Sequence, residues 1–354
     1  MATAEGTKAM LWDGIARRAF GLGGGGGEES VSQVVAEREP RTRLKIGIAL
    51  GSGAARGWSH IGVMRVLERE GIVPDVIAGS SVGAVVGACF AAGKLDVIEE
   101  FALSLTKRRV MGLLDFHITG SGLISGDRLR RLLEHDLADL RIENLPTRFA
   151  TIATELGTGH EIWITRGPLV EALRASYALP GVFDPVRLGG RWLMDGAIVN
   201  PIPVTTARAL GADLVICVNL NGDIRIRGTV IQSHSAEMEE SDEIIEAAAE
   251  ERSRWSLLNP MLDAAGRVRG LGRRAAAGPG IASVMVDAFN ITQDRIARSR
   301  LAGDPPDVMI APKLSPIGLF EFHRAEECIE LGKQATERAL PDLFELMRDT
   351  ARVG

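Results

Sequence analysis

Two adjacent serines lie between glycines in VIAGSSVGAVVG, residues 76–87, where one of them could be a nucleophile. The frame G-x-S-x-G fits only with Ser81 at its centre and with Gly79 and Gly83 two residues away on either side. A serine on a sharp turn between a strand and a helix is suited to acyl transfer, and the glycines prevent collisions in such a turn. For the motif on its own, a simple turn with a helix cap is the alternative.

Acyl transfer also requires hydrogen-bond donors for the negative charge that develops on the carbonyl oxygen. The small-residue loop GSGAARG, residues 51–57, could supply them with its backbone N–H groups, and its arginine could hold the loop or add a positive field. A phosphate-binding turn or a tightly packed turn is the alternative. The residues assigned to this oxyanion loop are Gly51, Ser52, Gly53, Ala54, Arg56 and Gly57.

A base must take the proton of the serine. Asp195 ends an apolar stretch and precedes a glycine, so it could lie in a partly desolvated cleft, where its pKa would rise and it could accept that proton. A structural aspartate that caps a turn is the alternative. None of the histidines has a turn context that places it near Ser81, but His323 remains the alternative base because it follows every other candidate in the chain. The histidines are His60, His117, His135, His160, His234 and His323.

Alternating strands and helices must position these groups. The apolar run at 44–50 is predicted to be a buried strand, followed by the GSGAARG turn and a helix at 58–71. A second strand at 74–79 precedes the serine turn and a helix at 84–93. Repeated strand, tight turn and helix are typical of an α/β protein with a largely parallel sheet and helices on both faces. Right-handed crossovers then place both turns at one end of the sheet.

A hairpin at 186–197 is predicted to deliver the aspartate. It turns at Gly189 and Gly190 and carries Asp195 at its far end. The other predicted elements are a helix at 123–137 capped by Ser125 or Asp127, strands at 148–156, 160–167, 212–220 and 305–314, and closing helices at 320–347.

The composition is that of a globular soluble protein. The chain has 354 residues, is 45% hydrophobic and carries a net charge of -5, and no basic stripe is interleaved with aromatic residues, so nucleic acid is not an expected partner. Cys89, Cys217 and Cys328 lie in apolar or helical stretches and are expected to be buried thiols. No segment has the pattern of a secretory signal or a spanning helix, so a cytoplasmic location is expected.

Four regions follow from the pattern along the chain. They are a flexible N-terminal tail at 1–43, a catalytic core at 44–222, a charged and partly flexible excursion at 223–285, and a C-terminal strand with helices at 286–354. Within the excursion, residues 252–274 hold six arginines against one aspartate and could dock on an anionic bilayer at the inner membrane face. A solvated loop is the alternative.

The motifs GSGAARG, GSSVG and DGA, in this order, resemble those of the patatin-like phospholipase family, particularly its bacterial branch, which is similar to the catalytic domain of neuropathy target esterase. The stretches ATELGTG, at 153–159, and LPGVFDPV, at 179–186, also resemble the family. The resemblance implies a three-layer α/β/α patatin-like fold and a Ser-Asp dyad, with Ser81 as nucleophile and Asp195 as base. It implies hydrolysis of phospholipids, lysophospholipids or other fatty-acyl esters, with no cofactor and no metal.

One departure from the family pattern concerns the oxyanion loop. The family's loop usually has the form G-G-G-x-R-G, whereas this chain has Ser52 and Ala54 at two of the glycine positions. If either position requires a positive φ, the donors would be misaimed, and the loss of one donor costs about 2.7 to 4 kcal/mol of transition-state stabilisation. The departure is compatible with a slower enzyme, or with a catalytically weak or inactive lipid-binding or regulatory protein on the same fold.

Overall fold

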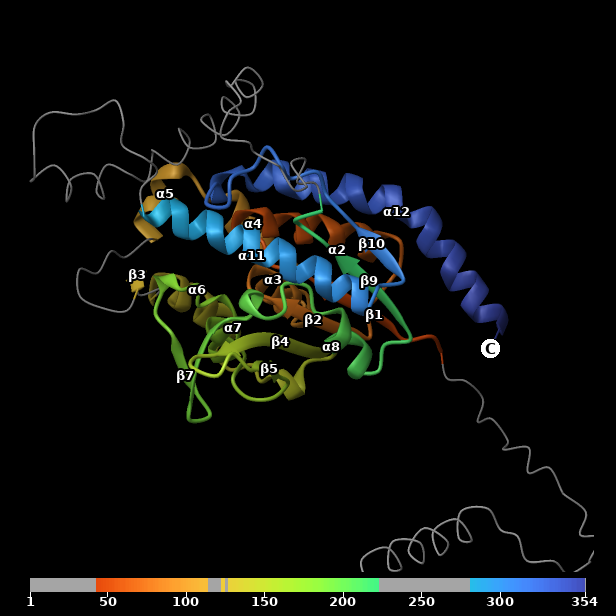
Figure 1. Ribbon diagram of the computed structural model, residues 1–354. Helices are drawn as coiled ribbons and strands as arrows, with labels where there is room; N and C mark the ends of the chain where they lie inside the picture. The colour runs from red at the N-terminus through yellow and green to blue at the C-terminus, as the bar shows by residue number, and fades with distance from the viewer. Residues whose placement is uncertain (1–42, 114–121, 125–126, 223–280, 354) are drawn as a thin grey trace, which may run out of the picture. The chain divides into compact units, whose positions relative to one another are not determined.

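The computed structural model describes residues 43–113, 122–124, 127–222 and 281–353 (Figure 1). Within these residues, eight strands form one mixed sheet with the order β10-β9-β1-β2-β4-β8-β7, and β5 pairs with β4. β3 (Gly122–Ile124) and β6 (Gly181–Phe183) form a separate two-stranded sheet. The strands of the large sheet are β1 (Ile46–Leu50), β2 (Val76–Ser80), β4 (Arg148–Glu155), β5 (Glu161–Ile164), β7 (Val186–Leu188), β8 (Arg191–Asp195), β9 (Leu214–Val218) and β10 (Val308–Ile310).

The centre of the sheet is parallel and its edge is antiparallel. Neighbouring strands from β10 through β9, β1 and β2 to β4 run parallel, whereas β4 pairs antiparallel with β5 and β8, and β8 pairs antiparallel with β7. β1, β2 and β9 are buried along their whole length. Strands covered on both faces read as continuous apolar runs, which is why the sequence marks these three clearly.

Helices cover both faces of the sheet, as the sequence predicts (Figure 1). Ile48 and Ile77 point into the larger core, with buried residues of α2, α3 and α12, while their neighbours Ala49 and Ala78 point into the smaller core, with α8 and Ala297 of α11. Successive residues of a strand face opposite sides, so a single strand serves both cores. The helical elements are η1 (Ala54–Trp58), α2 (Ser59–Arg69), α3 (Val82–Ala91), α4 (Leu95–Leu103), α5 (Lys107–Leu113), α6 (Asp127–Leu137), η2 (Ile142–Asn144), α7 (Leu169–Tyr177), η3 (Gly196–Ile198), α8 (Val204–Ala209), α11 (Ile281–Gly303), η4 (Phe322–Arg324) and α12 (Ala325–Val353).

The C-terminal helix α12 packs very closely on α2. A Cβ atom on Gly62 would lie 1.9 Å from the carbonyl oxygen of Ile329, and one on Gly332 would lie 2.0 Å from that of Ser59. The predicted closing helices are one short turn, η4, followed by α12 as a single helix that continues through Pro341. Leu343, beyond this proline, is buried in the larger core, so the second half of α12 also packs on the rest of the fold.

Several predictions fall on residues near or outside the described ranges. α11 begins at Ile281, inside the predicted excursion of 223–285, so regular structure starts there earlier than expected. Residues 252–274, together with His117, His234 and Ser125, lie outside the described residues. The three cysteines are free and buried, as predicted. None of the helices in the described ranges has the length and apolar character needed to cross a membrane.

Candidate active site

Ser81 lies on a strained turn at the end of β2, directly before α3. Its backbone angles are φ 54° and ψ -125°, a region that residues with a side chain rarely adopt. The N–H of Ser81 donates a hydrogen bond of 3.0 Å to Oγ of Ser176, a fully buried residue of α7. The turn is therefore held from the side by a helix that the sequence analysis did not identify.

The two glycines of the G-x-S-x-G frame are required by close approach of the backbone. A Cβ atom on Gly79 would lie 2.4 Å from Cα of Ala84, and one on Gly83 would lie 2.4 Å from the carbonyl oxygen of Leu50. Neither glycine has a positive φ. The collisions expected from the sequence are thus the reason for both glycines.

Ser81 and Asp195 are in direct contact. Oγ of Ser81 donates a hydrogen bond of 2.7 Å to Oδ2 of Asp195, which is the contact the sequence predicts. Oδ1 of Asp195 accepts a second bond, of 2.8 Å, from the N–H of Ala197. Burial raises the pKa of Asp195 to about 7, although both hydrogen bonds favour the carboxylate and lower it. Near neutral pH this side chain can therefore accept or release a proton.

The pairing along β4 brings the two residues together. β2 pairs with residues 148–152 of β4, β8 with residues 153–155, and β5 with residues 151–154. Because β5 overlaps both partners, it must occupy the opposite edge of β4, and β2 and β8 lie end to end on the same edge. A Cβ atom on Gly196 would lie 2.3 Å from the carbonyl oxygen of Ile152. Glycine is therefore required at this position, where the chain passes close to β4 at the end of β8.

The predicted oxyanion loop follows β1 and lies at the same end of the sheet. The N–H groups of Gly51, Ser52 and Ala55 are bonded to backbone carbonyls elsewhere in the chain. In the described part of the chain, no hydrogen-bond partner is found for the N–H groups of Gly53 and Ala54. Ala54 has a φ of 48°, the conformation that the sequence analysis identified as a difficulty for a residue other than glycine. The bonds of the other three N–H groups run from Gly51 to the carbonyl of Val218, from Ser52 to that of Pro201, and from Ala55 to that of Leu319.

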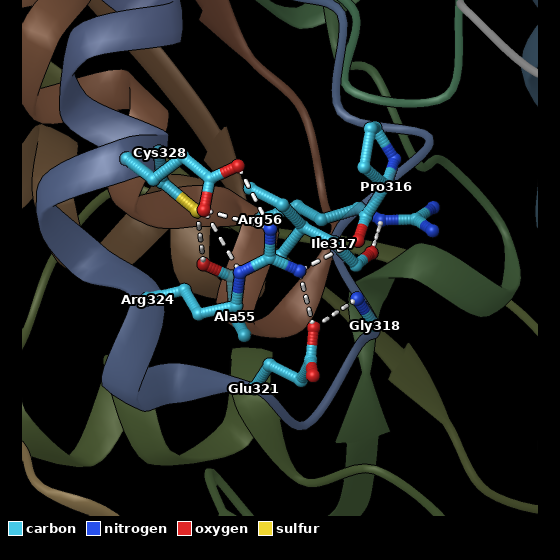
Figure 2. Close-up of polar contacts among 9 residues, drawn as sticks. Ala55, Arg56, Pro316, Ile317, Gly318, Glu321, Arg324 and Cys328 are labelled. Atoms are coloured by element: carbon cyan, nitrogen blue, oxygen red, sulfur yellow. Dashed lines mark hydrogen bonds and ion pairs between the residues drawn. The ribbon is translucent and has the colours of Figure 1, made fainter. Parts of the chain in front are cut away.

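Arg56 and Gly57, which were assigned to the same loop, do not line the cavity beside Ser81. Nε of Arg56 donates a bond of 2.7 Å to the carbonyl oxygen of Ile317, behind the loop (Figure 2). A Cβ atom on Gly57 would lie 2.0 Å from Cγ1 of Val82, the residue after Ser81. Both residues hold the loop against its neighbours. Gly51 is also absent from the cavity lining, and its N–H bond to Val218 attaches the loop to β9.

A cavity of about 140 Å³ opens beside Ser81 and Asp195 and is also lined by Ser52, Gly53 and Ala54. Two polar residues of α11, Asn290 and Gln293, complete its polar part. Neither residue was predicted from the sequence, and α11 itself was not among the predicted helices. The apolar wall consists of Leu179, Pro180, Val182, Phe289, Leu319 and Phe320.

Of the four histidines that the structure describes, none lines this cavity. His60 is fully buried, its Nε2 lies 2.7 Å from the carbonyl oxygen of Gly51, and burial lowers its pKa to about 4, so it is neutral. His323, the alternative base, lies in η4 and is half-buried. His135 and His160 are exposed. Across the described residues, no group of three or more histidine, cysteine or acidic side chains could hold a metal ion.

Comparisons with known proteins identify a family and several relatives of this chain. Residues 48–208 match the family described as patatin-like phospholipase. Over 337 residues the chain is 35% identical to proteins named "uncharacterized NTE family protein" from Mycobacterium tuberculosis and Mycobacterium bovis, which covers 86% of this chain and 93% of each relative. Over 188 residues it is 31% identical to patatin-like phospholipase domain-containing protein 6 of Mus musculus, which covers 49% of this chain and 13% of that protein.

Among solved structures, the crystal structure of VipD from Legionella pneumophila aligns with a TM-score of 0.40 and 14% identity, covering 84% of this chain and 67% of that one. The relationship to known proteins therefore rests on the sequence comparisons, in which the relatives from Mycobacterium match over nearly their whole length. The chain belongs to the patatin-like phospholipase family, together with the NTE family proteins that are its relatives.

Proposed function

We propose that this protein is a serine lipid acyl hydrolase in which Ser81 is the nucleophile and Asp195 is the base. Membership of the family implies lipid acyl hydrolase activity. The observation that carries the finer assignment is the 2.7 Å hydrogen bond from Oγ of Ser81 to the buried carboxylate of Asp195, inside a cavity with an apolar wall.

In the first half of the reaction, Oγ of Ser81 attacks the ester carbonyl carbon while Asp195 takes the hydroxyl proton. The carbonyl oxygen becomes an oxyanion, and the N–H groups of Gly53 and Ala54 are the donors available to it. The bond to the leaving alcohol then breaks, and Asp195 returns the proton to that oxygen. An acyl group remains on Ser81.

In the second half, Asp195 takes a proton from water as the water oxygen attacks the acyl carbon. The bond between Oγ of Ser81 and the acyl carbon then breaks, the proton returns to Oγ, and a fatty acid leaves. A base with a pKa of about 7 suits both halves near neutral pH, because it is partly deprotonated and still binds a proton well. One carboxylate can therefore replace the histidine and aspartate of a triad.

The surroundings of Ser81 support this chemistry in two further ways. α3 is ten residues long and begins directly after Ser81, so the positive end of its dipole lies beside the reacting centre. Apart from Ala54, six of the cavity-lining residues have apolar side chains, which suit a fatty-acyl chain. Phospholipids, lysophospholipids and other fatty-acyl esters are the substrate classes that we propose.

The test is hydrolysis of a soluble p-nitrophenyl ester, with labelling by a fluorophosphonate probe. Ser81→Ala should lower hydrolysis to the background rate and abolish labelling. Ser80→Ala is the matched control, because Ser80 is the adjacent serine, is fully buried and is not part of the cavity lining. Labelling that survives in Ser81→Ala would overturn the nucleophile assignment.

The base is tested separately with Asp195→Asn and His323→Ala. We expect the first to abolish hydrolysis and the second to leave it, since His323 does not line the cavity. The opposite result would favour a histidine-dependent esterase. If the unaltered protein neither hydrolyses esters nor reacts with the probe, the lipid-binding alternative is favoured, and the positive φ of Ala54 would be its structural basis.

A further inference from the structure

Ser52 and Gln293 form a buried hydrogen bond at the edge of the cavity. Oγ of Ser52 donates to Oε1 of Gln293 at 2.7 Å, across a sequence separation of 241 residues. Ser52 is 3% exposed and Gln293 is 6% exposed. Both residues line the same cavity as Ser81 and Asp195.

This bond attaches α11 to the loop that carries the free N–H groups. Ser52 directly precedes Gly53 and Ala54, and the backbone is fixed on both sides of them by the N–H of Ser52, bonded to Pro201, and the N–H of Ala55, bonded to Leu319. The side chain of Ser52 is a further attachment. Because Ala54 holds an unfavourable φ of 48°, the loop needs such attachments to keep its conformation.

α11 is itself fixed relative to the segment that follows Asp195. Nη2 of Arg300 pairs with Oε2 of Glu161 at 2.7 Å, and Oε1 of Glu161 accepts a bond of 2.7 Å from Nδ2 of Asn200. The N–H of Asn200 donates to the carbonyl oxygen of Gly196, the residue after Asp195. α11 also contacts η3, which begins at Gly196. One helix is thus tied both to the loop and to the aspartate segment.

We propose that Gln293 is a positioning residue of the oxyanion site, which holds Ser52 and thereby aims the N–H groups of Gly53 and Ala54 at the substrate carbonyl. The inference rests on the proposed hydrolase function. Because oxyanion donors act on charge that exists only in the transition state, loss of the bond should lower kcat with little effect on KM.

The experiment measures kcat and KM of the full chain with a soluble p-nitrophenyl ester. Ser52→Ala and Gln293→Leu should each lower kcat by roughly 10-fold to 100-fold and change KM by less than about twofold. The double variant should be no slower than the slower single variant, because both changes remove the same hydrogen bond. Gln334→Leu, on the exposed face of α12, is the matched control and should leave both constants unchanged.

Three results would overturn the proposal: single variants that keep kcat, losses that multiply in the double variant, or a loss confined to KM. Ser52→Thr, which keeps a hydroxyl, should retain a higher kcat than Ser52→Ala. Thermal unfolding of each variant separates a folding defect from a positioning effect. If Ser81→Ala is inactive while Gln293→Leu keeps its kcat, only this inference fails; if Ser81→Ala keeps the activity, the proposed function fails.

Discussion

Asp195 lies directly beyond Ser80 along one edge of β4: Ser80 pairs with Ile152, and Asp195 pairs with the next residue, Ala153. β2 runs parallel to β4 and β8 runs antiparallel to it, so the C-terminal ends of β2 and β8 converge. Ser81, the residue after Ser80, therefore meets the carboxylate of Asp195. The separation of the two groups is set by backbone pairing in the sheet, which is rigid compared with a loop.

The pH dependence of hydrolysis should follow the titration of Asp195. Its carboxyl group has a pKa of about 7 and must be deprotonated to take the proton of Ser81. We therefore expect kcat/KM to rise about tenfold per pH unit below pH 7 and to level off above it. Initial rates between pH 5 and 9 measure this. A flat profile from pH 5 to 8 would contradict the assignment of this base.

The same group should make the folded protein less stable at higher pH. The folded-state pKa of Asp195 lies above its ordinary value of 3.8, so between about pH 4 and pH 7 the unfolded chain releases a proton that the folded chain keeps. The resulting stabilisation is complete below about pH 4 and is lost as the pH rises through 7. Asp195→Asn removes this dependence, so it should raise Tm at pH 8 by more than at pH 5.

The exposed Asp213 provides the control for that measurement, as Asp213→Asn. Its change in Tm should be similar at both pH values. An Asp195→Asn variant whose gain in Tm is equal at the two pH values, or larger at pH 5, would show that the buried carboxyl does not titrate as proposed.

Ala54→Gly should stabilise the protein. Ala54 has a φ of 48°, which a glycine adopts without steric cost. Glycine also makes the unfolded chain more flexible, and this offsets part of the gain. We expect a net gain of about 0.5 to 1 kcal/mol in the free energy of unfolding, measured by chemical denaturation. Ala55→Gly is the control: it is fully buried and has no positive φ, so it should be destabilising. Equal effects of the two changes would argue against strain at Ala54.

Gly57→Ala should disturb the turn that holds Ser81. The new Cβ atom would lie 2.0 Å from Cγ1 of Val82, and Val82 directly follows Ser81. The rate of fluorophosphonate labelling of Ser81 should fall in this variant. Adding Val82→Ala to Gly57→Ala should restore part of the rate, because it removes Cγ1 of Val82. A double variant that reacts no faster than Gly57→Ala would indicate that the clash with Val82 is not the cause.

The sequence alone determined the local features of the site. The glycine frame distinguished Ser81 from Ser80, the hairpin placed Asp195 at a strand end, and the buried strands appeared as apolar runs. These features depend on residues a few positions apart, where strand and helix periods and glycine chemistry are informative. The family resemblance, confirmed by the comparisons, rests on the same local motifs.

Only the tertiary structure decided which groups meet. The contact of Ser81 with Asp195 depends on two strands sharing one edge of β4, and the free N–H groups of Gly53 and Ala54 are known only once the other donors of the loop have found partners. The bond between Ser52 and Gln293 depends on where α11 packs, 241 residues along the chain. Such contacts are set by long-range pairing and packing. The motifs indicated Asp195 as the candidate partner of Ser81, but the pattern of neighbouring residues contains no indication of Gln293.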